Sequence, residues 1–211
     1  MSETRGAAAG AVLWTLCLQY FVAEAVAIHA WTGAYSLSTN YISDLGAAAC
    51  FGGAGVCWSS PLRWLMNASF VLQGCLIAGG AALTRRVLPR GALAGAGAGL
   101  IGLSGLGVIA VGLAPEDANP AIHYFGAAEN LIFCNLGMLT LGLAMSVSQG
   151  ASRLIARAGV AAGVIGLAGL ACLASGHYAG IGPGGVERVA AYPFPLWLSA
   201  TGAWILTARR A

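Results

Sequence analysis

The sequence contains no lysine, and charged residues make up only 8% of its 211 residues. A soluble domain is roughly one quarter charged, so this chain lacks the polar groups that would cover a water-facing surface. Ten arginines and a formal net charge of +3 leave no broad basic face for nucleic acid. The hydrophobic fraction of 58% excludes intrinsic disorder. The alternating pattern of a lipid-facing β-barrel is also missing, so we predict an all-α integral membrane protein.

Six apolar stretches are long enough to cross a bilayer, which needs about 20 apolar residues per helix. They cover residues 8–31, 62–84, 91–114, 122–147, 158–178 and 189–207. The segments between them hold charges, prolines or turn-forming glycines. We therefore predict a single domain, residues 1–211, folded as a six-transmembrane-helix bundle.

Arginines mark one side of this predicted bundle. That side holds both termini and the second and fourth loops, with Arg5, Arg85, Arg86, Arg90, Arg153, Arg157, Arg209 and Arg210. Only Arg63 and Arg188 fall on the other side. The positive-inside rule then predicts a multi-pass protein of the cell membrane with cytoplasmic N and C termini and outward-facing first, third and fifth loops.

Two features of the first 60 residues have alternative interpretations. Residues 1–30 are also compatible with a cleaved signal peptide ending at Ala23-Glu24-Ala25, although the apolar run is long for such a segment. Cys50 and Cys57 flank a Gly-rich stretch of the first outward loop. A disulfide and two free thiols are equally compatible with that spacing.

Ionisable side chains within the spans are the most informative feature, because each costs about 2.5–3.5 kcal/mol at the bilayer centre. Glu24 and Glu129 each lie roughly 10 Å below the outer interface, and His29 and His123 lie nearer the surface on the same two helices. The inner halves of the spans carry no Asp, Glu, His or Arg. This distribution predicts one polar pocket that opens toward the outer leaflet. The alternative for single residues is a packing role, such as a Glu24–Tyr20 hydrogen bond or an interfacial His29.

The third span is rich in glycine, with small-residue spacings such as Gly95-x-x-x-Gly99. Such spacings allow helices to approach closely. We expect a central helix with neighbours pressed against it, and glycine-rich faces are also compatible with a homo-oligomer.

The first outward loop contains the string Asn40-x-Ile42-Ser43-Asp44-Leu45-Gly46, followed by Ser60-Pro61. Its Ser43-Asp44 pair is compatible with capping a short helix near Leu45 or with placing a carboxylate over the pocket mouth. The fourth span begins with His123-Tyr124-x-Gly126-Ala127, and Glu187-Arg188 precedes Tyr192-Pro193.

These motifs resemble a bacterial family of uncharacterised six-span membrane proteins. That family is in turn similar to the DRAM-like autophagy modulators and to the proteins that remodel GPI-anchor lipids. The resemblance implies a six-helix bundle and a link to membrane lipids, but it supplies no established reaction. Ser60-Pro61 differs from the acidic, proline-rich continuation of the eukaryotic relatives, so GPI chemistry is not carried over.

The polar residues favour a membrane-embedded enzyme acting on a lipid or isoprenoid-like substrate by acid–base or metal-assisted chemistry. The predicted catalytic residues are Glu24, Asp44, His123 and Glu129. The predicted substrate-binding residues are His29, Asn40, Ser43, Asn67, Asn130, His177, Glu187 and Arg188. No cofactor or metal ligand is assigned, since the chain has no His-Glu-x-x-His or Gly-x-Ser-x-Gly motif. A metal site would need His123, His177 and either Asp44 or His29 to converge.

Two non-enzymatic functions are the alternatives. A lipid-binding or regulatory protein would use Arg188 or Arg63 to pair a phosphate. A small transporter would use Glu24 or Glu129 to carry protons. Transport is disfavoured, because the inner halves lack ionisable residues and no inverted repeat is evident.

Overall fold

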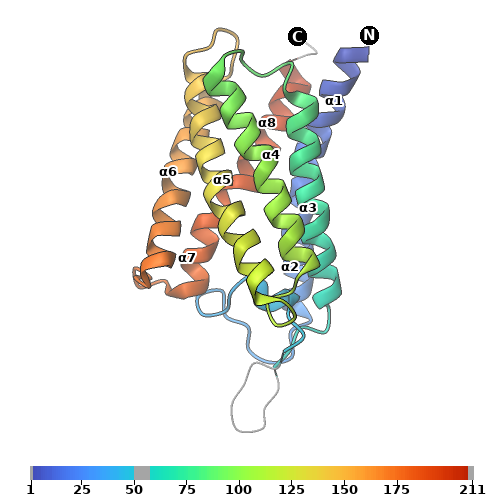
Figure 1. Ribbon diagram of the computed structural model, residues 1–211, viewed down its shortest axis with the longest axis vertical. Helices are drawn as coiled ribbons and strands as arrows, with labels where there is room; N and C mark the ends of the chain where they lie inside the picture. The colour runs from blue at the N-terminus through green and yellow to red at the C-terminus, as the bar shows by residue number, and fades with distance from the viewer. Residues whose placement is uncertain (1, 50–57, 209–211) are drawn as a thin grey trace.

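The computed structural model describes residues 2–49 and 58–208, and it is built from helices (Figure 1). Six helical stretches are long and apolar enough to span a membrane: Arg5–His29, Arg63–Thr84, Ala92–Leu113, Pro120–Ser146, Arg153–Ser175 and Gly182–Ala208. The predicted all-α six-helix architecture is therefore confirmed. Cys50 and Cys57 lie outside the described residues, so the disulfide stays a prediction.

The first and last spans are each built from more than one helix. The first span joins α1 (Ser2–Thr15), the 3-10 turn η1 (Leu16–Leu18) and α2 (Gln19–His29). The last span joins α7 (Gly182–Ala191) and α8 (Pro193–Ala208). The others are single helices: α3 (Arg63–Thr84), α4 (Ala92–Leu113), α5 (Pro120–Ser146) and α6 (Arg153–Ser175). A further 3-10 turn, η2 (Ser43–Gly46), lies in the first loop.

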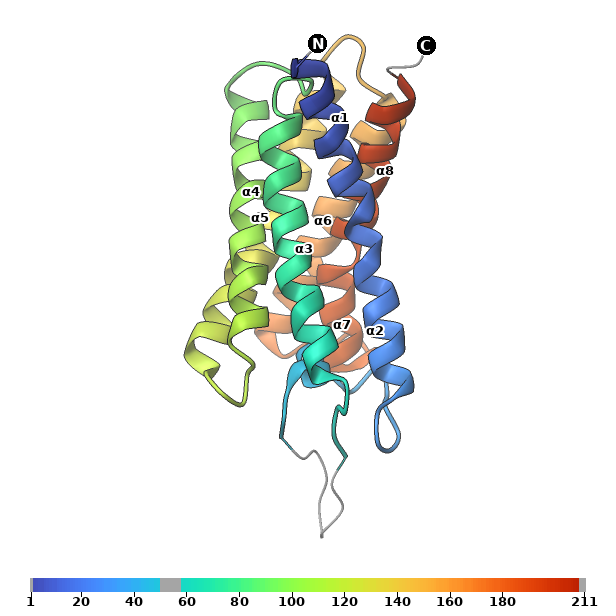
Figure 2. The ribbon, with the colours of Figure 1, turned by 90° about the vertical axis from the view of Figure 1, so that its right-hand side faces the viewer.

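The spans follow one another around the bundle in chain order. Helix α1 packs against α3, α3 against α4, α4 against α5, and α5 against α6. Helix α8 closes the ring by packing against both α6 and α1 (Figure 2). The start of α1, the end of α8 and the loops after α3 and α5 lie at one end (Figure 1). Residues 30–49, 58–62, 114–119 and 176–181 lie at the other end, which we call the loop end (Figure 1). This arrangement matches the predicted grouping of loops, and the orientation in the membrane stays a prediction.

The sixth span begins earlier than its apolar run. Helix α7 starts at Gly182, so Glu187 and Arg188 lie inside the last span. The prediction that the last span begins at residue 189 is therefore wrong. The span is interrupted at Tyr192, because Pro193 has no N–H group to continue the backbone ladder.

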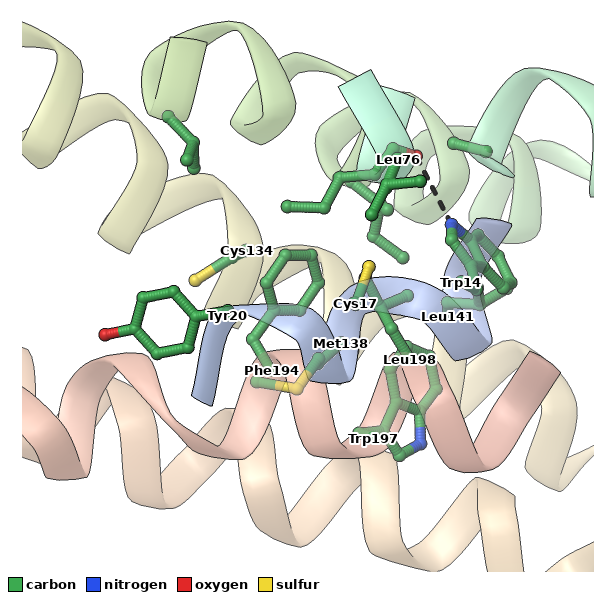
Figure 3. Packing of buried hydrophobic residues seen from close by; sticks show 14 of the residues in the cluster. Trp14, Cys17, Tyr20, Leu76, Cys134, Met138, Leu141, Phe194, Trp197 and Leu198 are labelled. Carbon is green, nitrogen blue, oxygen red and sulfur yellow. Dashed lines mark hydrogen bonds between the residues drawn. The ribbon is translucent and has the colours of Figure 1, made fainter. Parts of the chain in front are cut away.

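Two tryptophans attach the first and last spans to their neighbours (Figure 3). The buried Trp14 indole donates to the Ile77 carbonyl of α3 at 3.2 Å. Trp197 of α8 donates to the Ile155 carbonyl of α6 at 2.9 Å. A hydrogen-bonded indole is well suited to a buried site because its N–H group is satisfied. The first span is thus a full member of the bundle core.

Glycines set the spacing of α4 from its two neighbours. A Cβ atom at Gly105 would lie 2.7 Å from the Gly74 carbonyl oxygen of α3, and one at Gly97 would lie 2.7 Å from the Leu141 nitrogen of α5. The expected close packing around the third span is present. It does not use Gly95 and Gly99, since a Cβ atom at either position would meet nothing within 4 Å among the described residues.

We expect Gly105→Val to destabilise the bundle by about 1–3 kcal/mol, because the added side chain forces α3 and α4 apart. Gly99→Val on the same helix is the matched control, since it makes the same change in helix propensity at an open position. Thermal unfolding of the purified proteins in one detergent measures the difference. Equal midpoints for the two variants would contradict the close α3–α4 contact.

Candidate functional site

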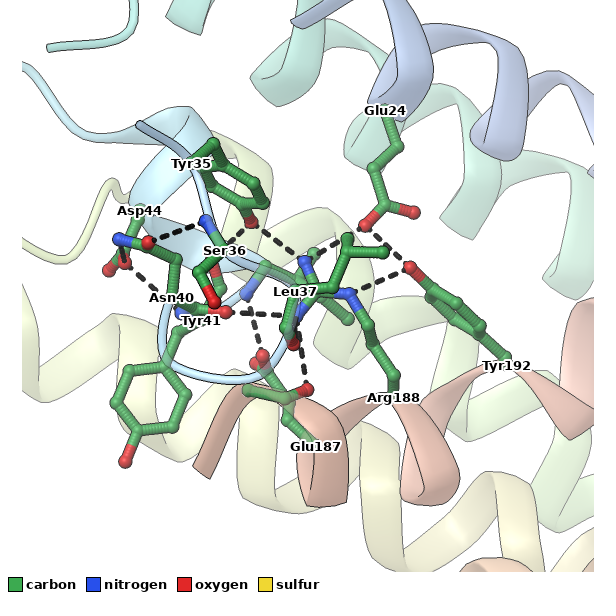
Figure 4. Close-up of polar contacts among 12 residues, drawn as sticks. Glu24, Tyr35, Ser36, Leu37, Asn40, Tyr41, Asp44, Glu187, Arg188 and Tyr192 are labelled. Carbon is green, nitrogen blue, oxygen red and sulfur yellow. Dashed lines mark hydrogen bonds and ion pairs between the residues drawn. The ribbon is translucent and has the colours of Figure 1, made fainter. Parts of the chain in front are cut away.

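Residues 35–46 of the first loop fold into a compact unit, which we call the cap segment (Figure 4). The Asp44 carboxylate accepts hydrogen bonds from the Asn40 amide at 2.9 Å and the Tyr41 backbone N–H at 3.0 Å. The Asn40 side chain in turn accepts from the Ser36 N–H at 3.1 Å. Neither Ser43 nor Asp44 caps η2, whose N-cap residue is Ile42 and has no side-chain cap bond. Asp44 instead folds the segment back on itself.

The cap segment is fastened to helix α7. The Ser38 carbonyl accepts the Gly184 N–H at 2.9 Å, and the Ile42 N–H donates to Glu187 Oε2 at 2.6 Å. A side chain at Gly184 would collide with the Asn40 carbonyl oxygen. The absence of a Cβ atom at this position therefore allows the loop to lie directly on the helix.

The cap segment is also tied to α3 and to the third loop. Ser60 donates to the Leu45 carbonyl at 2.6 Å, and Asn67 of α3 donates to the Gly46 carbonyl at 2.8 Å. Ser43 donates to Glu116 of the third loop at 2.7 Å. The string from Asn40 to Gly46 thus serves mainly to hold this fold in place.

The Arg188 guanidinium is the centre of the polar contacts in Figure 4. Its side chain is only 7% exposed, and Nη2 lies 3.2 Å from Glu24 Oε1, whose side chain is 4% exposed. Nη1 donates to the carbonyls of Leu37, Asn40 and Gly184 at 2.8–3.1 Å. These contacts join α7, the cap segment and α2.

Two tyrosines complete the surroundings of Arg188. Nε donates to the Tyr192 hydroxyl at 2.9 Å, and Nη2 donates to the Tyr35 hydroxyl at 2.7 Å. The Tyr192 hydroxyl donates a hydrogen bond to Glu24 at 2.7 Å, and the Tyr35 hydroxyl donates to the Tyr41 carbonyl at 2.9 Å. Burial raises the pKa of Tyr35, so its hydroxyl stays a donor. All five N–H groups of Arg188 have acceptors within the chain, which leaves none for a ligand phosphate.

A central cavity lies beneath the cap segment, with walls from every span except α6. Its polar lining consists of Tyr20, Ser43, Gln73, His123, Asn130 and Glu187. Its apolar lining includes Phe70, Ile77, Val111, Leu131 and Phe194. Tyr20, Cys134 and Phe194 are seen together in Figure 3.

The structure does not bring the four predicted catalytic residues together. His123 lines the cavity, but Glu24 is paired with Arg188 and Asp44 is engaged within the cap segment. Glu129 lies outside the described cavity lining, with its Oε2 atom buried against Gly107 of α4 and without a hydrogen-bond partner among the described residues. The cavity therefore lacks the expected set of carboxylates, and the single outward-opening polar pocket stays a prediction.

The predicted binding residues are also divided. Ser43, Asn130 and Glu187 line the cavity. Asn40, Asn67 and Arg188 hold the cap segment, and His29 and His177 are exposed at the loop end. Within residues 2–49 and 58–208, no group of three or more His, Cys, Asp or Glu side chains is placed to share a metal ion.

His123 has a defined orientation at the start of α5. Its Nδ1 atom lies 2.9 Å from the Ala114 carbonyl, which is left unpaired at the end of α4. A carbonyl can only accept, so Nδ1 carries the proton in the neutral ring and Nε2 is left as an acceptor.

Sequence reasoning missed several neutral residues of the site, chiefly Tyr35, Tyr192 and Gln73. Gln73 forms a polar cluster between the first and second spans, in which Gln19 donates to Gln73 at 3.0 Å and Ser69 donates to Gln19 at 3.0 Å. The Ser69–Gln73 spacing of four residues in an apolar helix was a usable signal. The tyrosines gave none, because tyrosine is common at membrane interfaces.

A family model described as "Protein of unknown function (DUF998)" matches residues 8–204. The chain belongs to this family. The match runs from the first span of this DUF998 chain into its last and includes the cap segment. No curated protein matches the chain, and no solved structure matches it.

We expect Arg188→Met to destabilise the protein by about 3–5 kcal/mol, because it leaves the buried Glu24 without its cation. Glu24→Gln should cost less, since the amide oxygen still accepts from Arg188 and Tyr192. Arg63→Met is the control, because Arg63 is an exposed arginine at the same end. The measurements are thermal unfolding in detergent and amide hydrogen exchange of residues 37–44. Unchanged exchange and stability in Arg188→Met would contradict the role of Arg188 in holding the cap segment.

Glu116 should make stability depend on pH. Burial raises the pKa of this carboxyl more than the Ser43 hydroxyl lowers it, and Asp44 and Asp117 raise it further. A carboxyl with a raised folded-state pKa contributes stability that is fully present below its unfolded pKa, about 4.3, and is lost as the pH rises through the folded value. We expect Glu116→Gln to flatten this fall in thermal midpoint between pH 4 and pH 7, roughly the range around that carboxyl. Asp117→Asn should flatten the fall less, because it removes only one of the causes of the shift. An identical pH profile for wild type and Glu116→Gln would contradict the assignment.

Proposed function

We propose that this multi-pass protein lies in the cell membrane and binds an amphipathic, lipid-like molecule in its central cavity. The observation that carries the proposal is a largely apolar cavity whose ionisable groups His123 and Glu187 lie near the loop end, with the neutral polar groups of Tyr20, Gln73 and Asn130 deeper along its walls. Ser43, His123 and Glu187 lie near the loop end, and the walls beyond them are largely apolar. A lipid-like molecule likewise has a polar group at one end of an apolar chain.

The depth of the cavity supports this kind of ligand. Ile77 and Cys134 line it and lie about 21 Å along α3 and α5 from the loop end, at a rise of 1.5 Å per residue. That depth reaches roughly the middle of a hydrocarbon core about 30 Å thick.

The size of the cavity suits a small ligand. The empty space in the cavity and at its mouth is about 700 Å³, part of which is open solvent, and about 90 Å³ is open to the centres of water-sized molecules. One water needs about 10–15 Å³ of space for its centre. The 90 Å³ that is open to such centres therefore holds a slender chain or a small headgroup.

The cap segment determines the route to the cavity in this proposal. Ile42 and Ser43 form part of the lining, and the segment is fastened to α3, α7 and the third loop. A ligand therefore approaches from the bilayer more easily than from water. The resemblance to families linked with membrane lipids supports the same class of ligand.

An enzyme acting on such a lipid is the second candidate, and the orientation of His123 favours it. With Nδ1 held by the Ala114 carbonyl, Nε2 is free to act as a general base toward a ligand in the cavity. The four-residue catalytic set has less support, because three of its carboxylates lie outside the cavity lining.

The proposal is tested by the lipids that copurify with the protein. Ala127→Phe fills the cavity, and Ala128→Phe adds the same side chain at an exposed position on the same helix. Mass spectrometry of lipid extracts should show a copurifying species that Ala127→Phe reduces at least tenfold and Ala128→Phe retains. Identical lipid profiles for both variants would refute the binding site.

The same preparation separates the binder from the enzyme. His123→Asn keeps a donor for the Ala114 carbonyl and removes the imidazole base. An enzyme predicts that this variant accumulates the bound species in cells and loses a product seen with wild type. Unchanged cellular lipids together with retained binding would leave a binding protein.

A further inference from the structure

We infer that the polar end of the ligand is a hydrogen-bond donor without negative charge, as in a long-chain alcohol or amine. This inference rests on the proposed binding function and narrows its ligand class. Three features of the cavity support it: the missing cation, the open acceptors and the nearby carboxylates.

No arginine lines the described part of the cavity, and the sequence contains no lysine. Arg188 lies close by on α7, but its N–H groups are bound to Glu24, two tyrosine hydroxyls and three carbonyls. Freeing it for a phosphate would leave Glu24 buried without a cation, which is strongly unfavourable. The cavity thus offers an anionic headgroup no positive charge.

The polar end of the cavity presents acceptors that the protein leaves unused. Glu187 Oε2 accepts from the Ile42 N–H, whereas Oε1 makes no hydrogen bond within the described residues and is not among their buried unpaired atoms. Asn130 Oδ1 is buried and unpaired within the same part of the chain. In the neutral ring with Nδ1 donating to Ala114, His123 Nε2 is a further acceptor. Buried acceptors are stabilised when a ligand supplies donors.

Several acidic side chains gather around the loop end of the cavity. Asp44 and Glu116 are close enough to interact electrostatically with Glu187, and Asp117 is close enough to interact with Glu116. The nearest cation, Arg188, is already neutralised by Glu24. These acidic groups offer an anionic headgroup no attraction, whereas an ionised carboxylate among them would attract an ammonium group.

The test compares four amphiphiles with the same 12-carbon chain: dodecylamine, dodecanol, dodecyl phosphate and dodecanoate. Native mass spectrometry of the full-length protein in detergent measures site occupancy as the difference between wild type and Ala127→Phe, which removes non-specific association. The amine, the alcohol or both should bind at least tenfold more tightly than the two anions. Binding of the alcohol alone indicates a neutral lipid, and binding of the amine alone indicates a long-chain base.

A charge variant sharpens the test. Glu187→Gln keeps an acceptor for the Ile42 N–H and removes the carboxyl that could ionise beside an ammonium group, so it should weaken amine binding about tenfold and change alcohol binding less than threefold. Glu129→Gln is the matched control, because this glutamate lies outside the cavity lining. The inference fails, while the proposed function stands, if the anions bind most tightly and Ala127→Phe abolishes their binding. Both fail if no probe and no copurifying lipid responds to Ala127→Phe.

Discussion

A buried guanidinium determines how the loop end of this bundle is arranged. Arg188 stands inside a membrane-spanning segment, where an unpaired charge would be costly. Its cost is offset by one carboxylate, two hydroxyls and three backbone carbonyls. These acceptors come from α2, α7, Tyr192 and the first loop, so satisfying one side chain requires the loop to fold back onto the helix.

The cap segment follows from this requirement. With Leu37 and Asn40 held by Arg188 and Ile42 held by Glu187, the loop covers the end of a cavity that the spans enclose. The cavity then combines a polar closed end with an apolar wall, and that combination supports a lipid-like ligand. The same bonds occupy Arg188, the nearest cation among the described residues, which is why the proposed ligand carries no negative charge.

The polar residues illustrate the limits of interpreting single side chains. Their concentration in one half of the spans pointed to a pocket, and a cavity lies there. Helical periodicity relates residues of one helix, but it does not show which residues of different helices meet. Glu24 and Glu129 lie at similar depth, yet one meets Arg188 and the other meets Gly107. The assignment of both to one catalytic set therefore had no basis in the sequence.

The sequence alone determined the class of the fold. A chain with so few charges and six long apolar runs lies in lipid, where each run can pair its own backbone N–H and C=O groups by forming a helix. It also determined which loops share a side, because each span crosses once. The tertiary structure decided the membership of the site. Arg188 and Glu24 are 164 positions apart, and their pairing depends on the closure of the ring by α8 against α1. Only the packed bundle brings such distant groups within hydrogen-bonding distance, since side-chain contacts extend over a few ångströms.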